Sequence, residues 1–487
     1  MADDLHHKTA WELSAALESR SLSAVELMKS LIARTEALDS SLHPFIAYDG
    51  DYAIRQAEES DRRRKESKSL GPLDGIPVAI KDNMSVRGWP LTCGSRMLEG
   101  YVSPWDCHVV SRLREAGAVL FGRTNMDEFA MGSSTENSAF FTTANPWDRS
   151  RVPGGSSGGS ACAVASGMVP LAIGTDTGGS IRQPAALCGI AGLKPSYGRV
   201  SRSGITAFAS SLDQAGPMAR CVRDVAILLR AIAGRDRHDS TSSPLPVANY
   251  ADALGRKRNW TIAVPEEIFS AGIDGAVEGA VRKAIEFYGA NGCTIKSVRL
   301  PDSAVAIGAY YVTATAEAFS NLSRFDGIRY GHRSKSAKDT LEIYAKSRGE
   351  GFGEEVKRRI MLGAFVLSGG YYDAYYGRAQ KARNFIGRAF DAIFESSDLV
   401  LTPTSPTTAF PIGEKSNDPL AMYLSDIYTV SINLARLPAI SIGCGFSQQN
   451  LPIGLQLIGK PFGEEDLLAA AHFFESHHDF HSKHPAL

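Results

Sequence analysis

Cysteine is scarce in this sequence and follows no pairing pattern. The seven cysteines are an odd number, and no two of them form a Cys-x-x-Cys pair. These absences exclude a disulfide framework and a zinc knuckle. Several of the cysteines stand among small apolar residues, which is typical of thiols in the core of a cytosolic protein. We therefore expect a reducing, cytoplasmic location.

Long apolar runs and an excess of one charge are also missing. No stretch of about 18 apolar residues occurs, and the first residues lack the basic and apolar regions of a signal peptide. The 52 Lys and Arg residues nearly balance the 53 Asp and Glu residues, whereas a chain that binds nucleic acid by itself is usually basic. We therefore predict no membrane span and no signal peptide, and we expect another chain to hold any RNA partner.

The alternation of apolar runs and helical stretches along the chain predicts an α/β fold with a central sheet covered by helices on both faces. From residue 72 onward, short apolar runs that suit buried strands alternate with helical stretches. Residues 1–60 are predicted to form N-terminal helices, and residues 305–395, rich in Ala, Tyr, Arg and Lys, a helical elaboration. Since no linker or repeat divides the chain, residues 1–487 are predicted to form one domain. The predicted strands are residues 76–80, 118–121, 169–173, 262–264, 399–401, 439–442 and 455–458.

Three familiar patterns occur in contexts that disfavour their usual functions. Residues 154–158 match the G-x-S-x-G nucleophile elbow, but the preceding residues 146–153 are polar and bounded by prolines, unlike the strand that the elbow requires. Residues 454–460 approach a P-loop, but their interior is apolar and Pro461 replaces the hydroxyl that would bind magnesium. Four histidines in residues 477–484 favour a solvated end over a metal site, because no other ligand pattern accompanies them. We predict no metal in this chain.

Lys81 is the first candidate for chemistry. It closes the apolar run of residues 76–80 and precedes Asp82. Burial at a strand end lowers the pKa of a lysine, and a neutral lysine can act as a general base. The alternative is a lysine that reaches solvent or pairs with Asp82.

Two glycine- and serine-rich segments are the second candidate. Residues 154–160 lead directly into a small-residue apolar helix, which disfavours a flexible linker. Residues 174–184 place Ser180 in a glycine-rich turn between a predicted strand and a helix. The N–H groups of Thr177, Gly178 and Gly179, with that of Ser180, could converge on one oxygen as an oxyanion hole. Since neither segment has a histidine nearby, reactive serines here would need a lysine as base.

Together these segments resemble the signature of the amidase signature family of serine hydrolases. The resemblance rests on residues 152–203 and on Lys81 with the two residues after it. Over nearly the whole chain, the sequence also resembles the family of glutaminase subunits of the glutamyl-tRNA(Gln)/aspartyl-tRNA(Asn) amidotransferases. One departure is Gly443, where many relatives have proline, and it touches no catalytic position. The segments that carry the wider resemblance are residues 145–148, 197–202, 210–214, 324–329, 358–363, 370–376 and 455–459.

The resemblance implies an amidase signature fold and a Ser-cisSer-Lys triad. Ser180 would be the acylated nucleophile, Ser156 the bridging residue after a cis peptide from Gly155, and Lys81 the base. Such a cis peptide is rare outside proline.

The resemblance also implies a site for the α-groups of glutamine. Arg359 would hold the α-carboxylate and Asp426 the α-ammonium. The alternative is that Arg358 and Arg359 form a solvated helix face and that Asp426 caps a turn.

These roles imply a glutaminase subunit of an amidotransferase with two partners, the amidotransferase subunits B and C. Ammonia from glutamine would pass to the first partner, which uses ATP and magnesium to convert mischarged Glu-tRNA(Gln), Asp-tRNA(Asn) or both, while the second bridges it to this chain. This chain itself would need no cofactor. A free-standing amidase for another small amide and a catalytically silent scaffold are the alternatives. The resemblance at residues 358–363 and 371–376 favours the amidotransferase, and the intact Lys81, Ser156 and Ser180 disfavour a scaffold.

Overall fold

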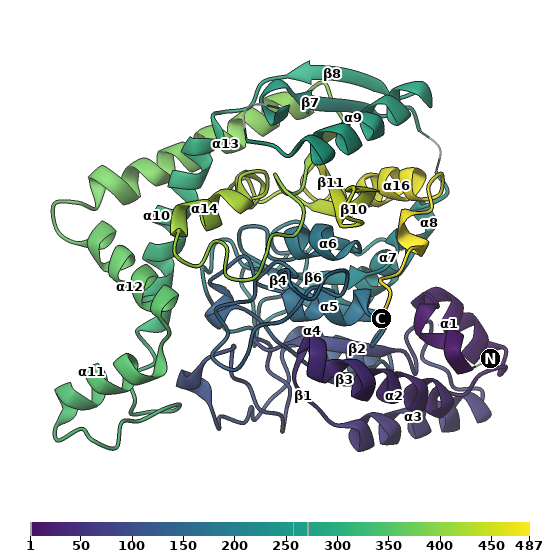
Figure 1. Cartoon of the computed structure of the whole chain (residues 1–487), viewed down its shortest axis with the longest axis horizontal. Helices are drawn as coiled ribbons and strands as arrows, with labels where there is room; N and C mark the ends of the chain where they lie inside the picture. The colour runs from purple at the N-terminus through teal and green to yellow at the C-terminus, as the bar shows by residue number, and fades with distance from the viewer. Residues whose placement is uncertain (1, 257, 270–271) are drawn as a thin grey trace.

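One mixed sheet of eleven strands runs through the computed structural model, which describes residues 2–256, 258–269 and 272–487 (Figure 1). The strand order is β1-β3-β2-β4-β6-β5-β10-β11-β9-β7-β8. β2 runs parallel to β3 and β4, and β7 runs parallel to β8 and β9, whereas the remaining neighbours are antiparallel. The strands are β1 (Phe45–Tyr48), β2 (Pro77–Lys81), β3 (Val119–Thr124), β4 (Leu171–Asp176), β5 (Ala191–Lys194), β6 (Gln214–Ala219), β7 (Thr261–Pro265), β8 (Thr294–Val298), β9 (Leu399–Pro403), β10 (Ala439–Phe446) and β11 (Pro452–Gly459).

Both faces of the central strands are covered. Every residue of β2 to β6, β9 and β11 is buried, and since successive side chains point to opposite faces, this burial needs cover on both. The predicted fold class is confirmed, and each of the seven predicted runs overlaps a strand, although residues 169 and 170 lie before β4. The α-helices are α1 (Ala10–Glu18), α2 (Ala24–Leu42), α3 (Gly50–Lys65), α4 (His108–Glu115), α5 (Gly158–Ala165), α6 (Arg182–Cys188), α7 (Val222–Ile232), α8 (Tyr250–Ala253), α9 (Gly275–Ala290), α10 (Ser303–Leu322), α11 (Thr340–Gly351), α12 (Glu354–Leu367), α13 (Arg378–Phe394), α14 (Pro419–Tyr423), α15 (Val430–Leu434) and α16 (Glu464–Glu475).

Short helical turns join these elements. Six of them are 3₁₀ turns, and η5 is a π-helix that runs into α13. The turns are η1 (Ala2–His7), η2 (Arg96–Leu98), η3 (Glu128–Ala130), η4 (Glu266–Phe269), η5 (Asp373–Gly377), η6 (Leu424–Asp426) and η7 (Phe480–Ser482).

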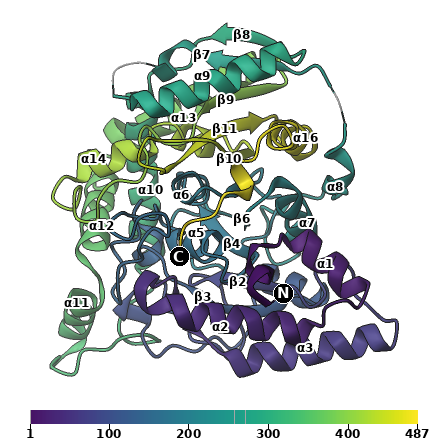
Figure 2. The ribbon, with the colours of Figure 1, turned by 45° about the vertical axis from the view of Figure 1, so that its right-hand side comes forward.

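The N-terminal region is helical except for one strand. Capping boxes begin the first two α-helices: Thr9 accepts from the N–H of Glu12 at the start of α1, and Ser23 accepts from that of Glu26 at the start of α2. The prediction of helices alone over residues 1–60 was wrong at β1, which pairs with β3. Residues 45–48 form a short apolar run, which periodicity alone does not distinguish from a buried helix segment. Figure 2 shows α1, α2 and α3 at the opposite end of the molecule from β7, β8 and α9.

The helical elaboration forms a second core beside the sheet. α10, α11, α12 and α13 occupy most of residues 303–394, and α10 packs on both α12 and α13. A Cβ on Gly363 would lie 2.1 Å from the carbonyl oxygen of Thr315, so the backbones of α12 and α10 are in direct contact there. Glycine at this position therefore sets how closely α12 approaches α10.

The C-terminal residues pack onto the body of the molecule. The ring of His478 stacks on Phe474 with 4.1 Å between centroids, and Arg220 Nη1 is 3.3 Å from Nδ1 of His484. The prediction of a solvated end therefore holds for His477, which is exposed, but not for His478, His481 and His484, which are half-buried in this packing. Within the described residues, no group of three or more His, Cys, Asp or Glu side chains is placed to hold a metal ion. None of the described helices combines the length and the apolarity needed to cross a membrane.

Candidate active site

Lys81 is the last residue of β2, and its side chain is fully buried. Its Nζ lies 2.8 Å from Ser156 Oγ, 2.8 Å from Ser157 Oγ and 3.4 Å from the carbonyl oxygen of Thr175. The fold thus brings Lys81 to the serine-rich loop that follows α4 and β3 in the chain. The end of β2 thus places the Lys81 amine against the hydroxyl groups of Ser156 and Ser157, away from solvent.

Asp82 does not pair with Lys81. Its carboxylate forms a buried ion pair with Arg123, so the alternative role of Lys81 was wrong on this point. Burial lowers the pKa of Lys81 to about 7, and the charges of Asp127 and Asp176 oppose this effect only in part. A group with this pKa is available as a base near neutral pH.

The loop that carries Ser156 requires glycine at the two preceding positions, Gly154 and Gly155. The peptide bond between Gly155 and Ser156 is cis. A Cβ on Gly155 would lie 2.1 Å from Asp127 Oδ2, and Gly154 adopts a φ of +83°. The N–H of Gly155 donates to Gln183 Oε1 at 2.9 Å, which ties the loop to α6. The glycines therefore let the backbone fill the space beside Asp127 where a side chain would clash.

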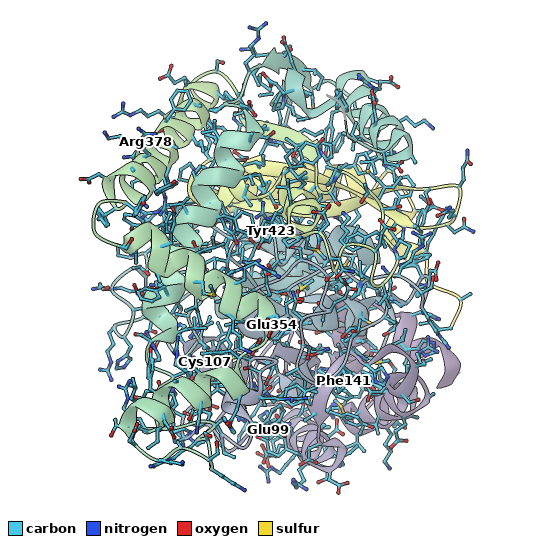
Figure 3. All side chains as sticks on the ribbon, turned by 60° about the vertical axis from the view of Figure 1, so that its left-hand side comes forward. Glu99, Cys107, Phe141, Glu354, Arg378 and Tyr423 are labelled. Atoms are coloured by element: carbon cyan, nitrogen blue, oxygen red, sulfur yellow. The ribbon has the colours of Figure 1, made fainter. Side chains whose placement is uncertain are left out.

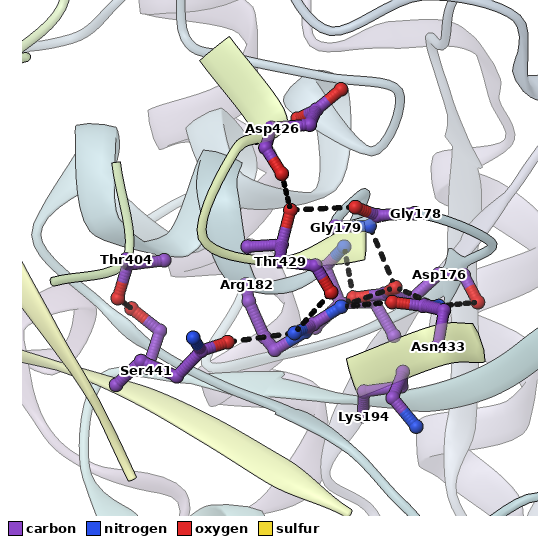
Figure 4. A network of polar contacts seen from close by, with 12 residues as sticks. Asp176, Gly178, Gly179, Arg182, Lys194, Thr404, Asp426, Thr429, Asn433 and Ser441 are labelled. Atoms are coloured by element: carbon purple, nitrogen blue, oxygen red, sulfur yellow. Dashed lines mark hydrogen bonds and ion pairs between the residues drawn. The ribbon is translucent and has the colours of Figure 1, made fainter. Parts of the chain in front are cut away.

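Ser180 lies in the turn between β4 and α6, as predicted. The N–H of Ser157 donates to the carbonyl oxygen of Ser180 at 3.2 Å, which joins the two serine segments. Beneath the turn, Arg182 donates to both carboxylate oxygens of Asp176, and this pair is fully buried (Figure 4). Although burial works in the opposite direction, Arg182 lowers the pKa of Asp176 to about 2. A permanent ion pair thus supports the backbone that carries Ser180.

Two of the three residues before Ser180, Thr177 and Gly179, donate hydrogen bonds to neighbouring carboxylates. Thr177 Oγ1 donates to Asp213 at 2.7 Å. The N–H of Gly179 donates to Asp176 Oδ1 at 2.8 Å in this structure, so an oxyanion would have to share that donor. An oxyanion-hole role for Thr177, Gly178 and Gly179 stays a prediction.

Arg359 lies on the inner face of α12 and is only 3 % exposed. Its Nε donates to Glu355 Oε1 at 2.8 Å, and its guanidinium carbon lies 5.2 Å and 5.5 Å from the ring centroids of Tyr311 and Tyr423. The alternative of a solvated helix face is thus wrong for Arg359, although Arg358 beside it is exposed. The aromatic rings and Glu355 fix the direction of the guanidinium group.

Asp426 lies at the end of η6, close to the Ser180 turn. Its Oδ2 accepts from Ser133 Oγ at 2.6 Å. Thr429 connects it to the turn, since its hydroxyl is 3.0 Å from the carbonyl oxygen of Asp426 and 2.6 Å from that of Gly178 (Figure 4). Burial raises the pKa of Asp426 to about 7, with the Ser133 hydrogen bond and the charge of Arg359 acting in the opposite direction. The structure thus brings Asp426, Arg359 and the Ser180 turn into one site.

Sequence reasoning missed two residues of this site. Tyr310, on α10, packs against Gly178 so closely that a Cβ on that glycine would be 2.5 Å from the phenol oxygen. In the sequence it is one of two tyrosines in an apolar helix, and only a core role could be predicted. Ser157 contacts Lys81 at the same distance as Ser156 does. Adjacent serines in a glycine-rich loop cannot be ranked from their spacing.

The fold and the site together define a class of protein: a mixed sheet whose buried lysine contacts two serines of one loop, and this loop is hydrogen-bonded to the turn that carries Ser180. The model of the amidase family matches residues 26–468, and the chain belongs to this family.

Within this family, the chain is similar to the subunits A of glutamyl-tRNA(Gln) amidotransferases. It is 53 % identical to that of Chloroflexus aurantiacus over 485 residues, covering 99 % of both chains. The crystal structure of the corresponding glutamyl-tRNA(Gln) amidotransferase subunit from Thermotoga maritima is 42 % identical with a TM-score of 0.78, covering 96 % of this chain and 94 % of that one. A peptide amidase from Stenotrophomonas maltophilia is 30 % identical with a TM-score of 0.82, covering 96 % of each chain.

Proposed function

We propose that this chain is the glutaminase subunit of a tRNA-dependent amidotransferase. It hydrolyses the side-chain amide of glutamine and supplies ammonia for converting Glu-tRNA(Gln), Asp-tRNA(Asn) or both to their amidated forms. The observation that carries the proposal is the contact between Lys81 Nζ and Ser156 Oγ at 2.8 Å in a site that also holds the opposite charges of Arg359 and Asp426. The full-length similarity to amidotransferase subunits supports it.

The proposed reaction begins with proton transfer along the triad. Neutral Lys81 accepts the proton of Ser156, which accepts that of Ser180 as Ser180 Oγ bonds to the carboxamide carbon. The C–N bond then breaks and the proton returns to the leaving nitrogen, so ammonia departs and an ester on Ser180 remains. Water attacks this ester with the same base, and glutamate leaves.

Recognition of glutamine requires one cation and one anion beside the nucleophile. Arg359 meets the α-carboxylate with its two terminal nitrogens, since its Nε is engaged by Glu355. Asp426 meets the α-ammonium, which favours the ionised carboxylate. Tyr310 packs against Gly178 and so forms one side of the Ser180 turn.

The fold does not separate this function from that of a free-standing amidase, because the peptide amidase shares it. The buried pair of Arg359 and Asp426 does favour glutamine. A substrate without α-groups would form no ion pair with Arg359 or Asp426, so these buried charges would keep only their contacts to Glu355 and Ser133.

The proposal includes two partner subunits. The ATP-dependent partner would hold the mischarged tRNA, ATP and magnesium, and the bridging partner would join it to this chain, all in the cytoplasm. The seven cysteines are free and buried in the described structure, which supports a reducing compartment.

An exposed apolar surface on α12 and η5 supports a partner. Met361 is 72 % exposed, and Leu362 and Phe365 continue the same face of α12. The ring of Phe365 lies 4.7 Å and 5.4 Å from those of Tyr371 and Tyr375, which are also exposed. Figure 3 shows the helices of this region along one face of the molecule, with Glu354 and Arg378 toward the viewer. Contiguous apolar surface of this kind marks a protein interface.

The test of the function is Ser180→Ala in the assembled amidotransferase. We expect glutamine-dependent amidation of mischarged tRNA to be lost and ammonia-dependent amidation to remain, because only the supply of ammonia is removed. Ser150→Ala, in an exposed loop, is the control and should change neither reaction. Loss of both reactions in Ser180→Ala, or glutamine-dependent activity that survives it, would contradict the proposal.

A further inference from the structure

Glu128 is a buried carboxylate that the proposed reaction does not use. It opens η3 and is 2 % exposed. Its Oε2 accepts from the N–H of Gly353 at 2.8 Å, and its Oε1 accepts from Ser95 Oγ. Gly353 is the N-cap of α12, so the carboxylate lies at the N-terminus of that helix, where a negative charge is favourable.

The contact between Glu128 and the start of α12 is tightly packed. A Cβ on Gly353 would lie 2.5 Å from Glu128 Oε2, so this position has no room for a side chain. Ser95 Oγ also lies 3.3 Å from the carbonyl oxygen of Gly351, and the ring of Phe352 meets Phe129 edge-on at 5.6 Å. The three residues before α12 are thus held by the segment around Glu128 and by Ser95.

The residue before Glu128 holds the opposite side of the site. Asp127 accepts from the N–H groups of Thr135 at 2.9 Å and Asn137 at 3.1 Å. Its Oδ2 occupies the space beside Gly155, immediately before Ser156. Two adjacent carboxylates therefore contact the two halves of the site: Asp127 the Ser156 loop, and Glu128 the start of α12.

Arg359 depends on where α12 begins. It lies in the second turn of the helix, and Glu355, in the first turn, orients its Nε. We propose that Glu128 is a positioning residue: it anchors the start of α12 to the catalytic core and so sets the distance between Arg359 and Ser180 that glutamine must span. This inference rests on the proposed function and adds to it a determinant of selectivity that touches neither substrate nor nucleophile. Small displacements of a binding group are enough to weaken recognition.

The test uses Glu128→Gln, which keeps the shape of the side chain but removes its charge; it is made at about pH 8, since burial raises the pKa of Glu128 to about 7. The KM for glutamine should rise by about five- to tenfold, as expected when a hydrogen bond to a charged group is weakened. The kinetics with a short aliphatic amide that lacks the α-groups should stay unchanged. Glu354→Gln is the matched control, since it removes a charge from the same helix end at an exposed position, and it should leave the glutamine KM unchanged.

A double-mutant cycle with Arg359→Ala separates positioning from general support of the fold. If Glu128 acts through Arg359, Glu128→Gln should have no further effect on the glutamine KM in the Arg359→Ala background. If Glu128→Gln folds poorly, Ser95→Ala takes its place as the test. It removes a hydrogen-bond partner of Glu128 on the core side, and it should raise the glutamine KM by a smaller factor.

The inference would be overturned by an undiminished effect of Glu128→Gln in the Arg359→Ala background, or by equal losses with glutamine and the aliphatic amide. Failure of the proposed function looks different, because the wild-type complex would then not hydrolyse glutamine at all.

Discussion

The pKa of Lys81 leads to a prediction that separates a catalytic lysine from a structural one. The shift from the ordinary value of 10.5 to about 7 corresponds to roughly 5 kcal/mol against the charged form at 1.36 kcal/mol per pKa unit. The burial of the side chain against Ser156 and Ser157 accounts for this cost. Because the group is fully buried, solvent does not screen the effect.

The direction of the pH dependence follows from the sign of this shift. Lys81 is protonated below its folded pKa and cannot accept a proton from Ser156. The glutaminase rate should therefore rise with pH through about 7 and level off above about 8, and at about pH 6 it should be about one tenth of the maximum. Lys81→Arg stays charged at every pH and should lose about 100- to 10,000-fold in kcat, the range that a general base contributes.

The assay is the release of ammonia by the assembled amidotransferase at saturating glutamine. Saturation removes the effect of Asp426, whose titration acts on substrate binding. Lys65→Arg, at the exposed end of α3, is the control and should keep the wild-type profile. A rate that is flat between about pH 6 and 8.5, or an active Lys81→Arg variant, would refute the role of Lys81 as base.

Three further predictions follow from the recognition site and its supporting helix. Asp426→Asn should raise the glutamine KM by about tenfold or more. In the wild type, the glutamine KM should rise as the pH falls below about 7, because burial raises the pKa of Asp426 to about 7 and its carboxylate is then neutralised. An unchanged KM in steady-state kinetics would exclude the ion pair with the α-ammonium. Gly363→Ala places a Cβ 2.1 Å from the Thr315 carbonyl oxygen; it should destabilise the protein by about 1–3 kcal/mol, seen as a lower Tm, and a wild-type Tm would show that the helices separate freely. Phe365→Glu should weaken assembly with the partner subunits in sedimentation experiments while its far-UV circular dichroism stays that of the wild type; full assembly would show that this surface serves another purpose.

The strand pattern shows which parts of the fold were visible in the sequence. Central strands such as β2 and β11 are buried on both faces, so their residues form continuous apolar runs that stand out. β8 pairs only with β7 at the edge of the described sheet, and every one of its residues is partly or fully exposed, so its composition is mixed. β6 contains Gly216 and Pro217, which weaken any strand signal, and only its pairing with β4 and β5 makes it a strand.

The sequence alone predicted Lys81, Ser156, Ser180, Arg359 and Asp426 as site residues, because residue type, glycine spacing and a family resemblance can all be read along the chain. It could not show that Lys81 contacts Ser157 as well as Ser156.

Only the tertiary structure decided how these residues meet. It paired Asp82 with Arg123, buried Arg359 while leaving Arg358 exposed, and joined Glu128 to a helix that begins more than 200 positions later. The physical reason is that a buried charge or hydrogen bond takes whichever partner the packing brings within reach. Composition and spacing specify which groups are present, whereas the closure of the sheet and its helices determines the distances between them.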